Sequence, residues 1–275
     1  MKNTLDKVPA EHKQPIAGLQ LFVSKLYDAD SFSSRLVVSQ SDSHTVSCSN
    51  CGLNAICLPY SLSHSEMDVV DAKIKRTKPL QKNESLFETG QTFTSLFAVR
   101  AGAVKTYSTD NKGNEQVIGF YLPGELIGLD AIERGKYHNT AKALETSSLC
   151  EIPFDQITEL SQKIGNLQTH MYRLLSKEIR EDQELQLLLG KKTAEERIAS
   201  FLFNLSQRYS ARHLSATTFR LPMVRTDIAN YLGLAVETTS RIFTRLQQQN
   251  ILKVDGKEVE ILDHPKLCQM AHCDN

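Results

Sequence analysis

Four cysteines constrain the fold of this chain more than any other feature. Cys48, Cys51 and Cys57 follow one another with the spacing C-x2-C-x5-C, and Cys150 lies 93 residues after Cys57. Thiols grouped this tightly in a chain without an export signal indicate a bound metal centre rather than a disulfide. A single centre would use all four thiols, so the fold has to bring Cys150 to the segment that holds the other three.

Three kinds of site are compatible with this spacing. A [4Fe-4S] cluster is held by four thiolates, often by closely spaced cysteines together with a distant one. Structural zinc also accepts four cysteines, but such sites more often use two C-x2-C pairs, and this set contains one. Disulfides or inert thiols are the third alternative. These ligand preferences favour an iron–sulfur cluster, with zinc as the second alternative.

Length and composition describe a globular chain. Its 275 residues are 40% hydrophobic, with no apolar run as long as a membrane span and no signal peptide after Met1. We therefore expect a cytoplasmic protein without a membrane partner, whose thiols stay reduced. Cys268 and Cys273 stand in a polar stretch, and we expect free thiols there, in a tail over residues 266–275.

The distribution of charge is more informative than its sum. Lys plus Arg and Asp plus Glu both number 32, so net charge does not indicate a nucleic-acid partner. Between Arg197 and Lys253 there are eight basic residues and two acidic ones, Asp227 and Glu237, a local excess of 8 − 2 = 6. This is a modest basic footprint of the kind that nucleic-acid-binding domains have. An ordinary solvated face is the alternative.

The first half of the chain changes from a polar extension to short strands. Residues 1–45 are rich in Ser, Asp and Lys, and we expect them to be disordered, with a short helix near residues 17–27. Residues 46–153 hold the cysteine loop and then β-type runs separated by glycine-bearing turns. The clearest runs are residues 95–99, 102–107 and 115–120. Strands at this spacing predict an antiparallel β-barrel or jelly roll.

Residues 154–190 have a helical period instead, which predicts one helix of about 30 residues. This length is typical of a helix that pairs with a second copy of itself, although packing against its own barrel is the alternative. Asp182 interrupts the apolar seam and would meet its own copy in a dimer, which opposes pairing. A solvated position for Asp182 is the alternative. The predicted dimerisation seam, with 4-3-4-3 spacing, consists of Leu175, Ile179, Asp182, Gln186 and Leu189.

Residues 191–265 have the pattern of a winged helix-turn-helix. Thr193 and Glu196 form a capping box at the start of a helix. A short helix over residues 226–232, a glycine turn and a longer helix over residues 236–249 follow, and then a hairpin over residues 252–261 with Asp-Gly at its turn. The whole chain is therefore predicted to be α+β, with a β-barrel, a long helix and a winged helix-turn-helix.

The longer helix places polar side chains where a recognition helix contacts DNA. Glu237, Ser240 and Arg241 share one face near its start and suit base edges: arginine can bond guanine O6 and N7, and glutamate can accept from cytosine N4. An ordinary surface pair between Glu237 and Arg241 is the alternative. Three further side chains on this helix are better placed for phosphates. They are Thr238, Thr244 and Arg245.

These motifs together resemble one family, the fumarate and nitrate reduction (FNR) regulators, the oxygen-sensing branch of the cyclic-AMP receptor protein superfamily. The resemblance covers roughly residues 48–262. It depends on the cysteine loop followed by Leu58-Pro59, on Leu149-Cys150-Glu151-Ile152-Pro153-Phe154, and on Val236-Glu237-Thr238-Thr239-Ser240-Arg241.

The resemblance implies an oxygen-responsive transcription factor, an activator and repressor rather than an enzyme. It implies that Cys48, Cys51, Cys57 and Cys150 hold an oxygen-labile [4Fe-4S] cluster, which promotes a homodimer. It also implies that Glu237, Ser240 and Arg241 bind TTGAT half-sites of palindromic double-stranded DNA, that Asp182 is a brake on dimerisation, and that the hairpin tip at residues 110–115 contacts RNA polymerase.

The chain also departs from its relatives. Cyclic-nucleotide receptors follow Gly-Glu-Leu with an Arg-Ser pair that holds the phosphate; Gly124-Glu125-Leu126 is present here, but Asn139-Thr140 stands in place of Arg-Ser. Without the guanidinium we expect no cyclic-nucleotide ligand. Gly52 follows the second cysteine, where relatives often carry a side chain. Ala235 occupies the expected N-cap of the recognition helix, which costs about 0.5–2 kcal/mol of helix stability relative to Ser or Thr.

Overall fold

The structure, a computed structural model, describes residues 46–272. The extension predicted at residues 1–45, with its helix near residues 17–27, and the thiol of Cys273 lie outside the described residues. The first elements of the described part are a 3-10 turn, η1 (Cys48–Asn50), and a helix, α1 (His64–Asp71). Among residues 46–272, none of the helices combines the length and the apolar character that a membrane span requires.

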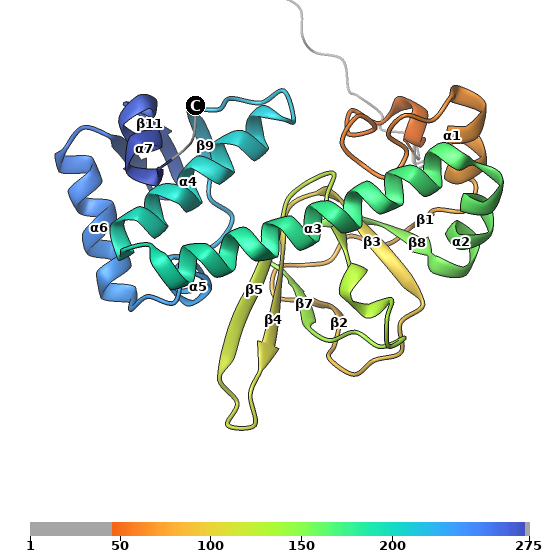
Figure 1. Cartoon of the computed structure of the whole chain (residues 1–275), viewed down its shortest axis with the longest axis horizontal. Helices are drawn as coiled ribbons and strands as arrows, with labels where there is room; N and C mark the ends of the chain where they lie inside the picture. The colour runs from red at the N-terminus through yellow and green to blue at the C-terminus, as the bar shows by residue number, and fades with distance from the viewer. Residues whose placement is uncertain (1–45, 273–275) are drawn as a thin grey trace, which may run out of the picture. The chain divides into compact units, whose positions relative to one another are not determined.

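Two antiparallel four-stranded sheets form the β domain (Figure 1). In spatial order, the first sheet contains β1 (Lys75–Arg76), β8 (Ser148–Pro153), β3 (Ser95–Ala101) and β6 (Leu126–Ile127). The second contains β2 (Ser85–Phe87), β7 (Thr140–Ala143), β4 (Val104–Thr109) and β5 (Glu115–Tyr121). A second 3-10 turn, η2 (Leu129–Ala131), follows β6.

The jelly-roll fold is therefore correct, but the closed barrel is not. Side chains from both sheets, among them Phe97 and Val104, pack into one apolar cluster between them. In the described part of the chain no strand ladder joins the two sheets into a ring. The edge strands β1 and β6 have two residues each, too few to continue a ladder around a barrel.

The β4–β5 hairpin forms where the sequence predicts it. Its turn is closed by the carboxylate of Asp110, which accepts hydrogen bonds from the backbone N–H groups of Lys112 at 2.8 Å and Asn114 at 2.9 Å. Gly113 supplies a positive φ of 83°, which a residue with a side chain rarely adopts.

The single long helix predicted over residues 154–190 is two helices, α2 (Phe154–Lys163) and α3 (Gly165–Lys191). Ile164 separates them in an extended conformation, with φ −114° and ψ 92°. Its side chain is buried in the core of the β domain, and the backbone leaves the helical conformation at this residue to place the side chain there. The apolar residues keep their helical spacing on both sides of Ile164, so the sequence pattern does not reveal a break of one residue.

The C-terminal part is the predicted winged helix-turn-helix. Its helices are α4 (Ala194–Ser210), α5 (Arg225–Tyr231) and α6 (Val236–Gln248), and its strands are β9 (Thr218–Arg220), β10 (Leu252–Asp255) and β11 (Glu258–Ile261). The Thr193–Glu196 capping box is present in both directions. Gly256, with φ +58°, begins the turn between β10 and β11.

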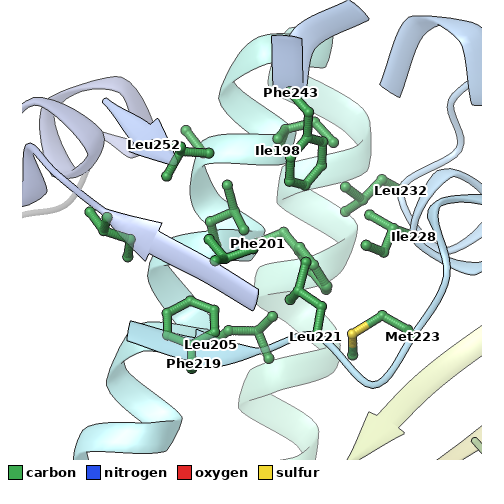
Figure 2. Packing of buried hydrophobic residues seen from close by; sticks show 14 of the residues in the cluster. Ile198, Phe201, Leu205, Phe219, Leu221, Met223, Ile228, Leu232, Phe243 and Leu252 are labelled. Carbon is green, nitrogen blue, oxygen red and sulfur yellow. The ribbon is translucent and has the colours of Figure 1, made fainter. Parts of the chain in front are cut away.

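One apolar core holds the three helices and the wing together (Figure 2). Ile198 and Leu205 of α4 are fully buried, and Ile228 of α5 and Phe243 of α6 pack against the same cluster. Because α5 and α6 pack into the same core as the wing, the orientation of α6 on the domain is fixed by close packing.

The predicted C-terminal tail is instead a helix, α7 (His264–Ala271). The carboxylate of Asp263 caps it by accepting from the N–H of Lys266, and Pro265 stands in its first turn. Leu267 and Ala271 are buried against the core of the winged domain. These two apolar positions, four residues apart, give the short segment a helical face, which its polar composition obscured.

Candidate functional site

Local turns arrange the three clustered cysteines. Cys48 begins η1, and its N–H donates to the carboxylate of Asp71 at 2.8 Å. The N–H of Cys57 donates to the carbonyl of Leu53 at 3.0 Å, which closes the turn between the second and third cysteines. Leu58, fully buried immediately after Cys57, anchors the end of the loop in the core of the β domain.

Cys150 reaches this loop through the first β-sheet. It lies on β8, paired with Arg76 of β1 on one side and Ala98 of β3 on the other. All four cysteine side chains line one cavity, together with apolar residues of the loop and the sheet. The fold therefore brings together the four thiols that the sequence selects. The remaining lining residues are Val46, Leu53, Asn54, Leu58, Pro59, Ile74, Arg76, Ala98, Val99, Arg100 and Ile152.

The cavity disfavours isolated thiolates. Burial raises the pKa of the Cys57 thiol to about 12; the backbone N–H of Leu58 opposes this, and the nearby Cys150 and Cys51 add to it. Burial also raises the pKa of Cys48, with a smaller contribution from Asp71. For Cys150 burial again dominates, although Arg76 and Arg100 oppose it. A cationic group that binds here has to displace protons from these thiols.

The donor set of four thiols suits two kinds of metal centre. One Zn²⁺ binds four sulfur ligands about 2.3 Å from a common point, and a [4Fe-4S] cluster takes one thiolate at each iron. Within residues 46–272, no group of three or more His, Cys, Asp or Glu side chains is arranged to hold one metal ion. Four thiols that line one largely apolar cavity are a ligand set whose chemistry fits a [4Fe-4S] cluster.

Sequence reasoning missed the polar support of this cavity. Arg76 forms an ion pair with Asp71 and donates to the carbonyl of Ile74 at 3.0 Å. Through Asp71 the pair holds the N–H of Cys48, and Arg76 stands directly beside Cys150 in the sheet. The strand pairing that places Arg76 there is a long-range feature, so no local motif marked it.

The predicted seam of α3 is largely exposed. Ile179 is 59% exposed, Asp182 and Gln186 are exposed, and Leu175 and Leu189 are half-buried. Burial of Leu167, His170 and Met171 is confined to the first turns of the helix. Tyr172, which the predicted seam does not include, stands seven residues before Ile179, at the same heptad position, and is 63% exposed.

The face of α6 predicted to contact bases is open to solvent. Glu237, Ser240 and Arg241 are exposed, and Arg241 Nε donates to the backbone carbonyl of Glu237 at 3.3 Å. No ion pair of the described residues includes Glu237 or Arg241, so the surface pair that competed with DNA contact is not formed. Ala235 is the N-cap and makes no side-chain hydrogen bond, as the sequence predicts.

The predicted phosphate contacts lie beside this face. Thr244 is exposed and Thr238 is half-buried. Arg245 is exposed and pairs with Glu195 of α4 at 3.2 Å. An exposed pair of this kind contributes about 0–1 kcal/mol, so it leaves the guanidinium available to a stronger anion.

The remnant of a nucleotide pocket is occupied by protein contacts. Glu125, of the Gly-Glu-Leu motif, forms ion pairs with Arg208 and Arg212 of α4. Burial alone would raise the pKa of Glu125, but the two arginines lower it to about 2. Asn139 donates to Asp130 at 3.0 Å, and the hydroxyl of Thr140 accepts from the N–H of Thr89 at 3.1 Å. The position expected for an arginine therefore offers no cation to a cyclic phosphate.

Family models match both parts of the chain. The Crp-like helix-turn-helix domain matches residues 196–270, and the cyclic nucleotide-binding domain matches residues 77–163.

Curated relatives match across most of the chain. It is 54% identical over 224 residues to the transcriptional activator protein FnrA of Stutzerimonas stutzeri, an alignment that covers 82% of this chain and 92% of that protein. It is 46% identical over 232 residues to the fumarate and nitrate reduction regulatory protein of Escherichia coli (strain K12), covering 84% and 93%. Among solved structures, FixK2 from Bradyrhizobium japonicum is similar, with a TM-score of 0.66 and 27% identity over 74% of this chain and 99% of that one.

Proposed function

Since the chain belongs to the FNR family of transcription regulators, we propose that it responds to oxygen through a [4Fe-4S] cluster held by Cys48, Cys51, Cys57 and Cys150. With the cluster bound it pairs through α3 and binds a palindrome of TTGAT half-sites; in oxygen it releases the DNA. It is a DNA-binding regulator rather than an enzyme. We place it in the cytoplasm, where thiols remain reduced.

The observation that supports this proposal most strongly is the meeting of four thiols at one cavity. Three come from a single loop and the fourth from the middle of a sheet. A cluster bound there would supply an oxygen-labile centre and would tie the loop to β8. Arg76 and Arg100 contribute positive charge beside Cys150, which offsets the negative charge of thiolate ligands.

The exposed seam of α3 supports pairing with a second copy. Tyr172 and Ile179 are large apolar side chains that are 63% and 59% exposed on the same side of one helix. Exposed apolar stripes with heptad spacing are typical of helices that pair. Asp182 belongs to the predicted seam; it is exposed, but desolvation by its neighbours and the charge of Asp130 still raise its pKa. Desolvation of two such carboxylates in a dimer opposes pairing, so we propose Asp182 as the brake.

Pairing in turn controls DNA binding. A dimer brings two α6 helices to two half-sites, and the second contact gains from effective concentration. Glu237, Ser240 and Arg241 would contact base edges, while Thr238, Thr244 and Arg245 would contact phosphates. A modest loss of pairing therefore removes most of the operator affinity.

Two partner assignments complete the proposal. The exposed turn of the β4–β5 hairpin, at residues 110–115, contacts RNA polymerase. Cyclic nucleotides are not ligands, because Glu125 is paired with Arg208 and Arg212 and because Asn139 replaces the phosphate-binding arginine.

The proposal is tested by DNA binding with and without oxygen. We expect protein prepared anaerobically to bind a labelled TTGAT palindrome in fluorescence anisotropy, and the same sample to lose that binding after exposure to air. A duplex with both half-sites scrambled is the matched control. Equal affinity before and after air, with iron still bound, would contradict the proposal.

A further inference from the structure

One polar side chain of α3 is buried against the cysteine loop. His170 is 7% exposed, and its Nε2 lies 3.2 Å from the backbone carbonyl oxygen of Cys57. Its ring also packs against the ring of Tyr60, three residues after Cys57, with centroids 5.2 Å apart. The helix that carries the pairing seam therefore makes a directional contact with one of the four cysteines.

The chemistry of this contact sets the state of the imidazole. A carbonyl oxygen can only accept, so Nε2 has to carry the proton and donate. Nδ1 is buried and has no hydrogen-bond partner in the described part of the chain. A buried nitrogen without a partner is unfavourable, and a leucine at this position would avoid that cost. The hydrogen bond to Cys57 is what the histidine provides and an apolar side chain would not.

The neighbouring apolar contacts of α3 lack this specificity. Leu167 and Met171 enter the apolar core that also contains Leu58 and Leu62. Apolar packing holds the helix against the loop but tolerates small rotations, whereas a hydrogen bond weakens steeply with angle. Asn166 of α3 also donates to the loop, at the carbonyl of Ser61, but this exposed bond is longer, at 3.4 Å, and its acceptor lies four residues after Cys57.

We propose that His170 is a positioning residue that couples the conformation of the Cys57 segment to the orientation of α3. The inference rests on the proposed function. The carbonyl oxygen that accepts from His170 and the thiol that lines the cavity both belong to Cys57. A rearrangement around that thiol therefore moves the hydrogen-bond acceptor of His170. A helix transmits such a movement as a rigid rod: Asp182 lies twelve residues further on, about 18 Å along the axis.

Two substitutions separate the hydrogen bond from the packing. His170→Leu retains the apolar bulk and removes the donor, and His170→Gln retains a donor. Thr169→Leu changes an exposed neighbour that lies outside the predicted seam. Iron content and visible absorption of anaerobic protein measure loading of the thiol site, and sedimentation measures pairing.

We expect His170→Leu to load iron as the wild type does but to dimerise at least tenfold more weakly, with His170→Gln restoring most of the pairing. Thr169→Leu should match the wild type. The double variant His170→Leu/Asp182→Ala should still dimerise, which shows that the leucine variant folds.

Two results would overturn the inference. One is normal pairing of a fully loaded His170→Leu protein. The other is a parallel loss of iron and pairing that His170→Gln does not rescue, since His170 would then only support the thiol site. If the wild type itself binds no iron or pairs equally in air, the proposed function fails instead, before any variant is compared.

Discussion

The thiol cavity and the recognition helix are built in opposite ways. The cavity combines a loop with a strand 93 residues away, and burial raises the pKa values of Cys48, Cys57 and Cys150. The face of α6 comes from Glu237, Ser240 and Arg241, three residues within five positions of one helix, and their side chains are exposed. A site assembled from distant segments depends on every member, whereas independent contacts on one helix contribute separately. Substitutions should therefore act nearly all-or-none at the cavity and in graded steps on α6.

The largest effect is expected for Cys150→Ser. Three thiolates hold a cluster poorly, so this variant should lose iron and operator binding together. Cys268→Ser, which changes a cysteine on α7 far from the cavity in sequence, is the control and should retain both. Iron analysis and anisotropy on the TTGAT palindrome check this. Full iron loading and normal binding by Cys150→Ser would remove Cys150 from the ligand set.

In the proposed function α3 links the cavity to the DNA-binding helix, and Asp182→Ala should have the second-largest effect, on the pairing of α3. Removal of the seam carboxylate relieves the repulsion and desolvation that oppose pairing. The variant should sediment as a dimer and bind the operator in air, with or without iron. Glu184→Ala removes an exposed carboxylate that pairs with Arg180 and lies outside the predicted seam. If Asp182→Ala stays as monomeric as the wild type in air, Asp182 is not the brake.

Protonation of Glu178, also on α3, should change the free energy of unfolding over a defined pH range. Burial, then Asp182 and Glu181, raises the pKa of Glu178 from 4.5 to about 7, although Lys177 opposes this. The folded chain therefore binds this proton more tightly than the unfolded chain, and stability should fall as pH rises from about 4.5 to about 7, by up to roughly 3 kcal/mol. Urea unfolding of the wild type and Glu178→Gln across this range measures the difference. An unchanged pH dependence in Glu178→Gln would exclude Glu178 as the source.

On α6 the graded behaviour is tested by two arginines. Arg241→Ala should cost about 1–3 kcal/mol on the palindrome and relax selectivity at one guanine. Arg245→Ala should weaken binding to every sequence and flatten the salt dependence. Titrations of TTGAT and a guanine-substituted half-site distinguish the two. An equal loss on both duplexes for Arg241→Ala would make Arg241 a phosphate contact.

The smallest effect is expected beside the cavity, at Gly52. A Cβ added at Gly52 would meet no atom within 4 Å, and the glycine does not have a positive φ, so Gly52→Ser fits without strain. The serine should restrict the loop next to Cys51 and slow the loss of visible absorption in air. Stopped-flow mixing with aerated buffer measures this rate, and an unchanged or faster rate would contradict the idea.

Sequence patterns predicted the features that depend on near neighbours. The Thr193–Glu196 capping box, the β4–β5 and β10–β11 hairpins and the uncapped start of α6 all agree with the structure. Each depends on residues within a few positions of one another, so local chemistry is sufficient to define it.

The features that were missed depend on burial or on distant pairing. Ile164 interrupts the long helix because its side chain enters the core, and α7 forms because Leu267 and Ala271 find an apolar partner surface. Arg76 meets Cys150 only through the register of β1 and β8. The four cysteines selected from the sequence line one cavity, and their role as cluster ligands stays a prediction.

The most direct test of the account follows the thiol site and the pairing of α3 in one sample. Protein prepared without oxygen should be coloured and sediment as a dimer, with the visible absorbance moving at the dimer boundary. After air is admitted, the visible band should bleach and the protein should sediment as a monomer. A colourless anaerobic protein, or a dimer that persists unchanged after the band has bleached, would contradict the central claim that a cluster at the four cysteines controls pairing.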